Sequence, residues 1–120
     1  MKKIWIFIAL SGALAVIMGA MSAHMLKDIL EAKDIARIQT AATYQMYHTL
    51  LIAMLAVYYR YNQHKAVQQS TWVFVFGIVL FSGSLYLYTF TKIHALVFIT
   101  PVGGMLLILG WLSLARLAKR

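Results

Sequence analysis

The apolar residues of the chain fall into four long runs, and short polar segments separate them. The runs cover residues 4–23, 41–59, 71–91 and 97–116. Each run is close to the ~20 residues that a helix needs to cross the hydrocarbon core of a bilayer. The pattern therefore predicts an all-α fold, a four-transmembrane-helix bundle in which residues 1–120 form a single integral membrane domain.

The composition strengthens this prediction and excludes several kinds of site. Of the 120 residues, 62% are hydrophobic and 12% are charged, whereas a soluble domain carries about 25% charged residues. The chain has no cysteine, so disulfides, thiolate metal sites and cysteine nucleophiles are excluded. We expect no metal and no cofactor, and we expect the lipid bilayer to be the main partner.

The net charge of +8 indicates membrane topology rather than a nucleic-acid surface. The basic residues stand mostly beside the ends of the runs and form no stripe along one helix, so we expect no nucleic-acid partner. Seven lie on one side of the predicted membrane: Lys2, Lys3, Arg60, Lys65, Arg116, Lys119 and Arg120. Four lie on the other side together with all three acids: Lys27, Lys33, Arg37, Lys92, Asp28, Glu31 and Asp34. Because basic residues favour the cytoplasmic side, both termini are predicted to be cytoplasmic.

The N-terminal segment has some features of a secretory signal peptide. Lys2 and Lys3 precede an apolar run that ends at Met21-Ser22-Ala23. The run is ~20 residues long instead of the usual length of about 7–15, and Met21 stands where a small residue is expected. We therefore predict a first helix that is retained.

Residues 24–40 are expected to form the first outer loop. The part from Lys27 to Thr40 contains no Gly or Pro, which makes it a candidate for an interfacial helix. Its apolar residues do not gather on one helical stripe, however. Within this segment Asp34 and Arg37 have the i,i+3 spacing of a helical ion pair.

Small residues predict close helix packing in three of the runs, because they let backbones approach where no hydrophobic effect drives association. The positions are Ser11, Ala15, Gly19 and Ala23 in the first run, Gly83 in the third, and Gly103, Gly104 and Gly110 in the fourth. We interpret the four-residue repeat of the first run as a face that packs on a neighbouring helix. The same residues also suit a homo-oligomer seam, or a docking face that would make the chain an accessory subunit of a larger complex.

Polar side chains inside the second run are the main functional signal. An unpaired amide or imidazole in hydrocarbon costs roughly 2–7 kcal/mol, so such groups are paired, face the protein interior or serve a function. Counting about 1.5 Å per residue from the run ends places polar residues from every run in the outer half of the membrane. The expected cluster is His24, Tyr44, Gln45, Tyr47, His48, Ser82, Ser84, Tyr86 and Thr100.

The faces of this cluster can be compared by their helical angles. Ser82 and Ser84 diverge by about 200° around a helix, so we expect only one of them to point inward. Ser82 is the one that aligns with Tyr86. Trp111 is expected near the inner end of the fourth run, away from the cluster.

Four stretches of the chain have the character of sequence motifs. They are Ser22-Ala23-His24-Met25-Leu26, Thr40-Ala41-Ala42-Thr43-Tyr44-Gln45-Met46-Tyr47-His48-Thr49-Leu50, Phe81-Ser82-Gly83-Ser84-Leu85-Tyr86-Leu87 and Ile99-Thr100-Pro101-Val102-Gly103-Gly104. In this order they resemble a family of small bacterial inner-membrane proteins of unknown function that includes YgdD and YwdK. The resemblance implies a four-span, multi-pass protein of the bacterial inner (plasma) membrane, and it implies no established activity.

Two functional interpretations of the cluster remain open. In the first, Gln45 or His48 meets Ser82, Ser84 or Thr100 in an interhelical hydrogen-bond network that fixes the helix register. In the second, His48 lines a pocket for a quinone, a lipid headgroup or another neutral molecule, and the protein binds or transports it.

Several other functions are disfavoured by the residues that are present. No Asp or Glu lies in any run, which argues against proton-coupled or cation-coupled export. Two of His24, His48 and His94 could ligate a haem, but only His48 is expected to be buried. The chain has no paired carboxylates, nucleophile–base spacing or phosphate-binding loop, so we expect no catalytic residues and a non-enzymatic role.

Overall fold

The protein is described by a computed structural model that covers residues 1–119 of the chain. This part is all-α and contains no strand. The four α-helices are α1 (Lys2–Ala23), α2 (Ala32–Tyr61), α3 (Lys65–Thr91) and α4 (Leu96–Ser113). Two short 3-10 helices are η1 (Leu26–Asp28), which precedes α2, and η2 (Leu114–Lys119), which continues α4.

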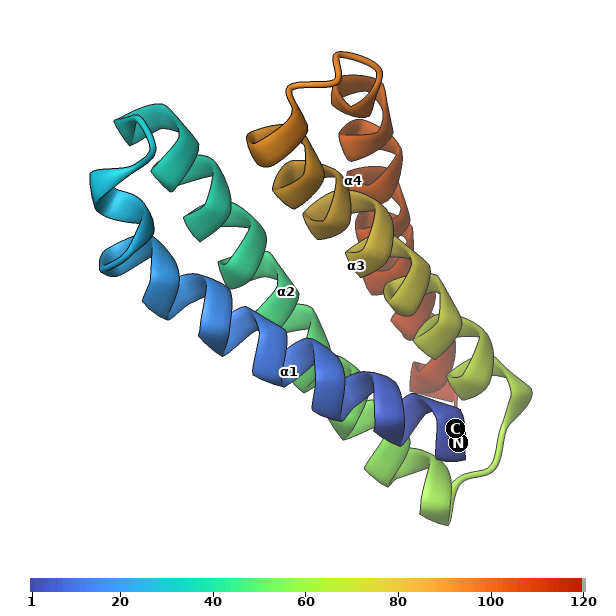
Figure 1. The fold of residues 1–120 in the computed structure, drawn as a ribbon. Coiled ribbons are helices and arrows are strands. Elements are labelled where there is room, and N and C mark those ends of the chain that lie inside the picture. Colours follow the sequence, from blue (N-terminus) through green and yellow to red (C-terminus); the bar gives the residue numbers. More distant parts are fainter. Residues whose placement is uncertain (120) are drawn as a thin grey trace.

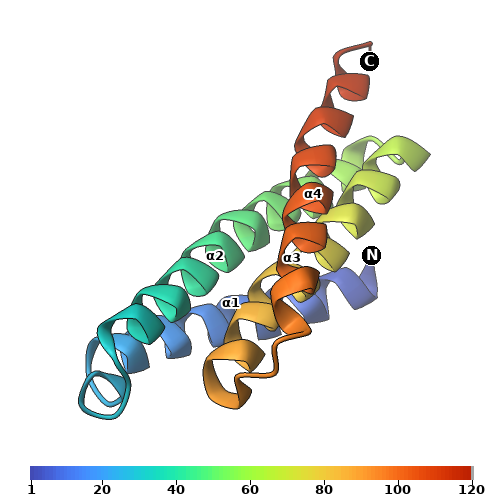
Figure 2. The same cartoon turned by 90° about the horizontal axis from the view of Figure 1, so that it is seen from above.

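The helices pack in chain order as two antiparallel hairpins, α1 with α2 and α3 with α4 (Figure 1). The hairpins meet where α2 packs against α3, and Figure 2, seen from above, shows α4 crossing over α3. No pair of Cα atoms from α2 and α4, or from α1 and α4, lies within 8 Å. Thus α3 has helices on two of its sides, whereas α4 packs its backbone against α3 alone.

Two helices begin earlier than the sequence pattern predicted. The α2 helix starts at Ala32, nine residues before the apolar run at 41–59, so the expectation of a loop over residues 24–40 is wrong for residues 32–40, and the connection from α1 ends at Glu31. Burial of Ile38 and Ala41 stabilises the added N-terminal turns of α2, and the helix dipole favours the negative charge of Asp34 in the first turn. The α3 helix starts at Lys65 instead of residue 71, because hydropathy marks only the apolar part of a helix.

Three helical segments of the described chain are long and apolar enough to cross a membrane. They are Lys2–Ala23, Lys65–Thr91 and Leu96–Ala118. The fourth, α2, has 30 residues and a length of about 45 Å. It is not among these three segments, and its buried polar side chains include the amide of Gln45 and the imidazole of His48.

Glycines set the distance between α3 and α4. A Cβ atom on Gly103 would lie 2.3 Å from the backbone nitrogen of Phe81, and one on Gly110 would lie 2.7 Å from the ring of Phe74. A Cβ atom on Gly104 would meet only the Phe81 ring, at an ordinary 3.6 Å. The close approach of the two helices therefore requires glycine at positions 103 and 110, but it does not require glycine at position 104.

The remaining small residues pack less closely than the sequence repeat predicted. A Cβ atom on Gly19 or Gly83 would meet nothing within 4 Å, and Ala23 is exposed. Ser11 and Ala15 are buried as expected, but the next buried position is Ser22. A repeat of exactly four residues rotates by about 40° at each step, so the predicted ridge turns away from α2 before it reaches Ala23.

Candidate functional site

Gln45 is the centre of a hydrogen-bonded network that joins three helices. Its Nε2 atom donates to the backbone oxygen and to the Oγ atom of Ser11 in α1, at 3.1 Å each. Its Oε1 atom accepts from the hydroxyl of Tyr86 in α3 at 2.6 Å. Ser11 also shares a hydrogen bond of 2.8 Å with Thr49. Because Gln45 is only 4% exposed, these bonds satisfy an amide that would be costly to bury unpaired.

Ser82 and Ser84 serve the two different neighbours of α3. Ser82 donates to the backbone oxygen of Ala41 in α2 at 2.8 Å, and Ser84 hydrogen-bonds Thr100 of α4 at 2.5 Å. Both serines are buried. The expectation that only one of them points inward is wrong, because α3 packs between α2 and α4 and has two buried faces.

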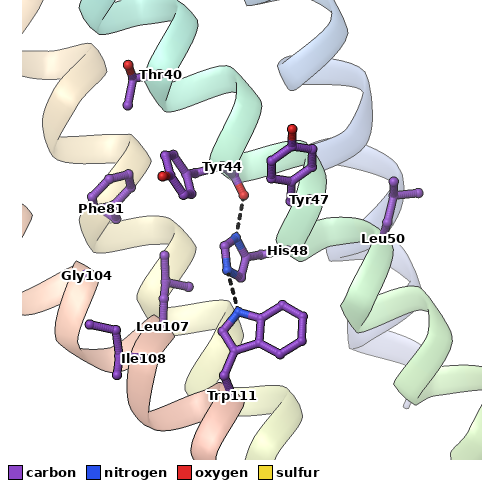
Figure 3. Close-up of a pocket in the computed structure, with 10 residues that line it drawn as sticks. All are labelled: Thr40, Tyr44, Tyr47, His48, Leu50, Phe81, Gly104, Leu107, Ile108 and Trp111. Atoms are coloured by element: carbon purple, nitrogen blue, oxygen red, sulfur yellow. Dashed lines mark hydrogen bonds between the residues drawn. The ribbon is translucent and has the colours of Figure 1, made fainter.

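His48 is held by a hydrogen bond at each ring nitrogen, as Figure 3 shows. Its Nδ1 atom lies 2.6 Å from the backbone oxygen of Tyr44, and its Nε2 atom lies 3.0 Å from Nε1 of Trp111 in α4. A carbonyl oxygen only accepts and an indole N–H only donates. His48 is therefore neutral in this arrangement, with its proton on Nδ1 and an acceptor lone pair on Nε2.

The His48–Trp111 pair lies in the wall of a groove between α2 and α4, with a volume of about 810 Å³. Its lining contains no charged side chain and consists of Thr40, Tyr44, Tyr47, His48, Leu50, Phe81, Gly104, Leu107, Ile108 and Trp111. Figure 3 shows these side chains around the space between the two helices. The volume falls in the range of roughly 300–1,000 Å³ that is typical of small-molecule pockets.

Aromatic contacts hold the rings of the groove in place. The Tyr44 ring stacks on His48 with centroids 6.1 Å apart and meets Phe81 edge-on at 5.3 Å. The buried ring of Phe74 lies 5.9 Å from both His48 and Trp111. On its open side the groove is bordered by Tyr47, which is 61% exposed, and by Trp111, which is 51% exposed. The site thus has an aromatic floor of packed rings and a rim that is accessible from outside.

An ionic cluster ties the first turn of α2 to the end of α3. The carboxylate of Asp34 accepts from Arg37 at 2.6 Å and from Lys92 at 2.5 Å. The Lys92 ammonium and the Arg37 guanidinium hold the pKa of the Asp34 carboxyl below its ordinary value. The guanidinium of Arg37 also lies 4.7 Å from the centre of the Tyr88 ring. Asp34 itself is buried.

The structure divides the predicted cluster into separate groups. Gln45 and Tyr86 are bonded directly, whereas Ser84 and Thr100 pair on the other side of α3. Neither Gln45 nor His48 bonds the partners predicted for it, which were Ser82, Ser84 and Thr100. His24 is exposed and makes no side-chain hydrogen bond to residues 1–119.

Sequence reasoning missed Trp111 as the partner of His48. Because α2 begins at Ala32, His48 lies about 24 Å along that helix, and Trp111 lies about 22 Å along α4. The two residues are therefore level. The early start of α2 was the missing information, since residue counting from position 41 placed His48 much nearer the outer end.

The described residues contain no cluster of side chains suited to bind a metal ion. Within residues 1–119 no group of three or more His, Asp or Glu side chains lies together. His48 has both of its ring nitrogens engaged, and His94 is exposed. The chemistry that the site can perform is hydrogen bonding and aromatic contact with a neutral molecule.

Comparison with known proteins identifies similar chains. Residues 18–104 match the model of a family described as "Protein of unknown function (DUF423)". The chain is 44% identical to a UPF0382 membrane protein of Haemophilus influenzae over 95% of its own length and 91% of that protein. It is 42% identical to a UPF0382 membrane protein of Staphylococcus saprophyticus, with coverage of 95% and 94%. It is 40% identical to the UPF0382 inner membrane protein YgdD of Escherichia coli, with coverage of 88% and 81%. No solved structure matches the chain.

Proposed function

We propose a ligand-binding role for this chain, which belongs to the DUF423 family of membrane proteins. In this proposal the chain crosses the inner membrane four times, and the groove between α2 and α4 holds a neutral, membrane-soluble molecule. The observation that carries the proposal is the hydrogen bond between buried His48 and half-exposed Trp111 in the wall of an uncharged groove of about 810 Å³. The role is non-enzymatic.

The four-span topology is supported by how α2 buries its polar groups. Gln45 is paired with α1 and α3, and His48 is paired with α4 and with its own helix. Polar side chains that face the protein interior and are paired are tolerated inside a bilayer. The relative in Escherichia coli is named an inner membrane protein, which supports the location.

The orientation is supported by the charge distribution. An even number of crossings puts both termini on one side, where seven of the eleven basic residues of the sequence lie. Basic residues favour the cytoplasmic side of the membrane. The termini are therefore cytoplasmic, and the Asp34–Lys92 end of the molecule faces the outside.

A neutral ligand is supported by the lining of the groove. The wall has aromatic rings and two hydrogen-bonding side chains in its centre, and it has no carboxylate that could hold a cation. It also has no basic side chain that could hold an anion. A molecule dissolved in the bilayer can reach the groove laterally, because α2 and α4 do not close on each other.

The Gln45 network has a different task in this proposal. It holds α1, α2 and α3 together and shares no side-chain hydrogen bond with His48. Among the described residues no buried side-chain nitrogen or oxygen lacks a hydrogen-bond partner. A scaffold of this kind stays fixed while a ligand enters on the other side of α2.

Fluorescence quenching of Trp111 tests the proposal. The chain has three tryptophans, so Trp5→Phe with Trp72→Phe leaves Trp111 as the only one. The probe is a phenol with a bromine-tipped octyl chain in the para position, titrated into the protein in detergent micelles. We expect quenching that saturates with the probe, because bromine quenches tryptophan on contact.

A filled groove provides the control. Gly104 lies in the groove lining, and a Cβ atom there makes only an ordinary contact with the Phe81 ring, so we expect the longer side chain in Gly104→Leu to fill the groove and block the probe. Gly19→Leu is the matched control, because Gly19 faces open space away from the groove. Saturable quenching that Gly104→Leu abolishes and Gly19→Leu preserves supports the proposal. Quenching that only rises in proportion to the probe, or that ignores Gly104→Leu, overturns it.

A further inference from the structure

The hydrogen bonds of His48 restrict the chemistry of any ligand that contacts it. The Tyr44 carbonyl holds the ring proton on Nδ1, at a distance of 2.6 Å. The Nε2 atom is therefore an acceptor, and it needs a donor because His48 is buried. Trp111 supplies that donor when no ligand is present. The indole, in turn, is a donor that needs an acceptor.

A single hydroxyl group can satisfy both partners at once. Its proton donates to Nε2 of His48, and its oxygen accepts from Nε1–H of Trp111. Two such bonds in series separate the nitrogens by about 4.5–5 Å, compared with 3.0 Å in the direct bond. Trp111 can retreat by this amount because its side chain is half exposed and α4 makes no close backbone contact with α2.

Other groups leave one of the two partners unsatisfied. A ketone, ether or ester oxygen accepts from Trp111 but offers nothing to Nε2 of His48. A carboxylate has the same defect and also brings an uncompensated charge into an uncharged groove. A plain hydrocarbon chain leaves the His48–Trp111 bond in place and gains only apolar contact.

We infer that the groove binds a membrane-soluble alcohol or phenol, whose hydroxyl inserts between His48 and Trp111. The inference rests on the proposed function and names the ligand class of the same groove. A ring that carries the hydroxyl lies against Tyr44 and Phe81, which already pack edge to face. Its apolar tail lies along Leu107 and Ile108 of α4, which line the same groove.

A matched pair of probes tests this inference. The first is the bromine-tipped alkylphenol, and the second is its methyl ether, which has the same shape and tail but no proton to donate. Both are titrated into the variant that retains only Trp111, with the histidine unchanged. We expect both probes to quench Trp111 saturably and the phenol to bind about tenfold more tightly, since a buried acceptor left without a donor has a substantial cost.

The His48 side chain should be the source of this preference. In His48→Phe the ring remains but the acceptor is lost, so the phenol and the ether should bind within threefold of each other. A nitrogen-15 spectrum of His48 gives a second readout that needs no substitution at the histidine. Nε2 should keep the chemical shift of an unprotonated nitrogen when the phenol binds, and its resonance should move less with the ether.

The outcomes separate this inference from the proposed function. A phenol preference near tenfold that disappears in His48→Phe supports the inference. Saturable binding of both probes with less than threefold preference overturns the inference and leaves the groove as a binding site. Failure of both probes to saturate overturns the proposed function, and the inference falls with it.

Discussion

Gln45 and His48 lie one helical turn apart on α2, yet they belong to two different regions of the molecule. Gln45 faces α1 and α3, both of which pack against α2, and its bonds reach Ser11 and Tyr86. His48 faces α4, which does not pack against α2, and its interhelical bond reaches the half-exposed Trp111. Two buried, hydrogen-bonded polar side chains can therefore have different roles. The role depends on whether the helix that carries the hydrogen-bond partner packs against α2.

The cavities beside the two residues also differ in volume. The cavity beside Gln45 has a volume of about 260 Å³, and the hydrogen-bonded side chains of Gln45 and Tyr86 form part of its wall. The groove beside His48 has about 810 Å³. Substitutions on the Gln45 side should therefore change stability, whereas substitutions on the His48 side should change binding more than stability.

The largest effect on stability is expected from a substitution on the face of α4 that packs against α3, and not on the face that borders the groove. Gly103→Ala would place a Cβ atom 2.3 Å from the Phe81 backbone nitrogen, and backbone atoms cannot rotate away. We expect a loss of about 3 kcal/mol in the free energy of unfolding. Gly104→Ala, one residue along, is the matched control and should change it by less than about 0.5 kcal/mol. Unfolding in mixed micelles measures both, and equal losses would contradict the assigned packing.

Removal of the amide network should have the next largest effect. Gln45→Leu keeps the side-chain size but leaves Tyr86 without its acceptor, while Ser11 retains Thr49. We expect a loss of about 2 kcal/mol in the free energy of unfolding, with ligand affinity unchanged. Tyr86→Phe removes the hydroxyl as well, so Gln45→Leu combined with Tyr86→Phe should cost less than the sum of the two changes. Strict additivity would show that the two side chains do not interact.

A smaller effect on stability is expected on the groove side. Trp111→Phe removes the indole donor of the His48 bond, but the ring is half exposed and lies on a helix that does not pack against α2. We expect a loss of about 0.5–1 kcal/mol, measured in the same unfolding experiment. A loss as large as that of Gln45→Leu would mean that the groove side also holds the fold together.

The smallest effect on stability is expected from a change of pH, which acts on the ionic cluster of Asp34, Arg37 and Lys92. The pKa of Asp34 is lowered in the folded protein by Lys92 and Arg37, from an ordinary value of 3.8. The Asp34 carboxylate therefore binds a proton more tightly in the unfolded chain than in the folded protein. The stability that the ionised carboxylate contributes is fully present above its ordinary pKa and is lost as the pH falls through its lower folded pKa. The melting temperature should decline as the pH falls below about 4. Asp34→Asn should flatten the decline, and an unaltered acid profile would exclude this carboxylate as its cause.

Much of the fold, but less of the site, could be predicted from the sequence. Four apolar runs predicted the four helices, and the same pattern marked Gln45 and His48 as unusual. The partners were not predictable because α2 begins at Ala32, a boundary set by burial of Ile38 and Ala41 rather than by hydropathy. That shift of nine residues puts His48 level with Trp111. The two buried faces of α3, which carry Ser82 and Ser84, likewise depend on the order in which the helices pack.

The most direct test of the account measures phenol affinity in two matched variants that retain only Trp111. Gln45→Leu and His48→Leu each replace one buried polar side chain of α2 by leucine. Gln45→Leu should bind the bromine-tipped phenol with the parent dissociation constant, at a temperature where the variant is folded. His48→Leu should bind it about tenfold more weakly. Unchanged affinity in His48→Leu, or an equal loss in both variants, would contradict the division of α2 into a side that holds the fold and a side that binds.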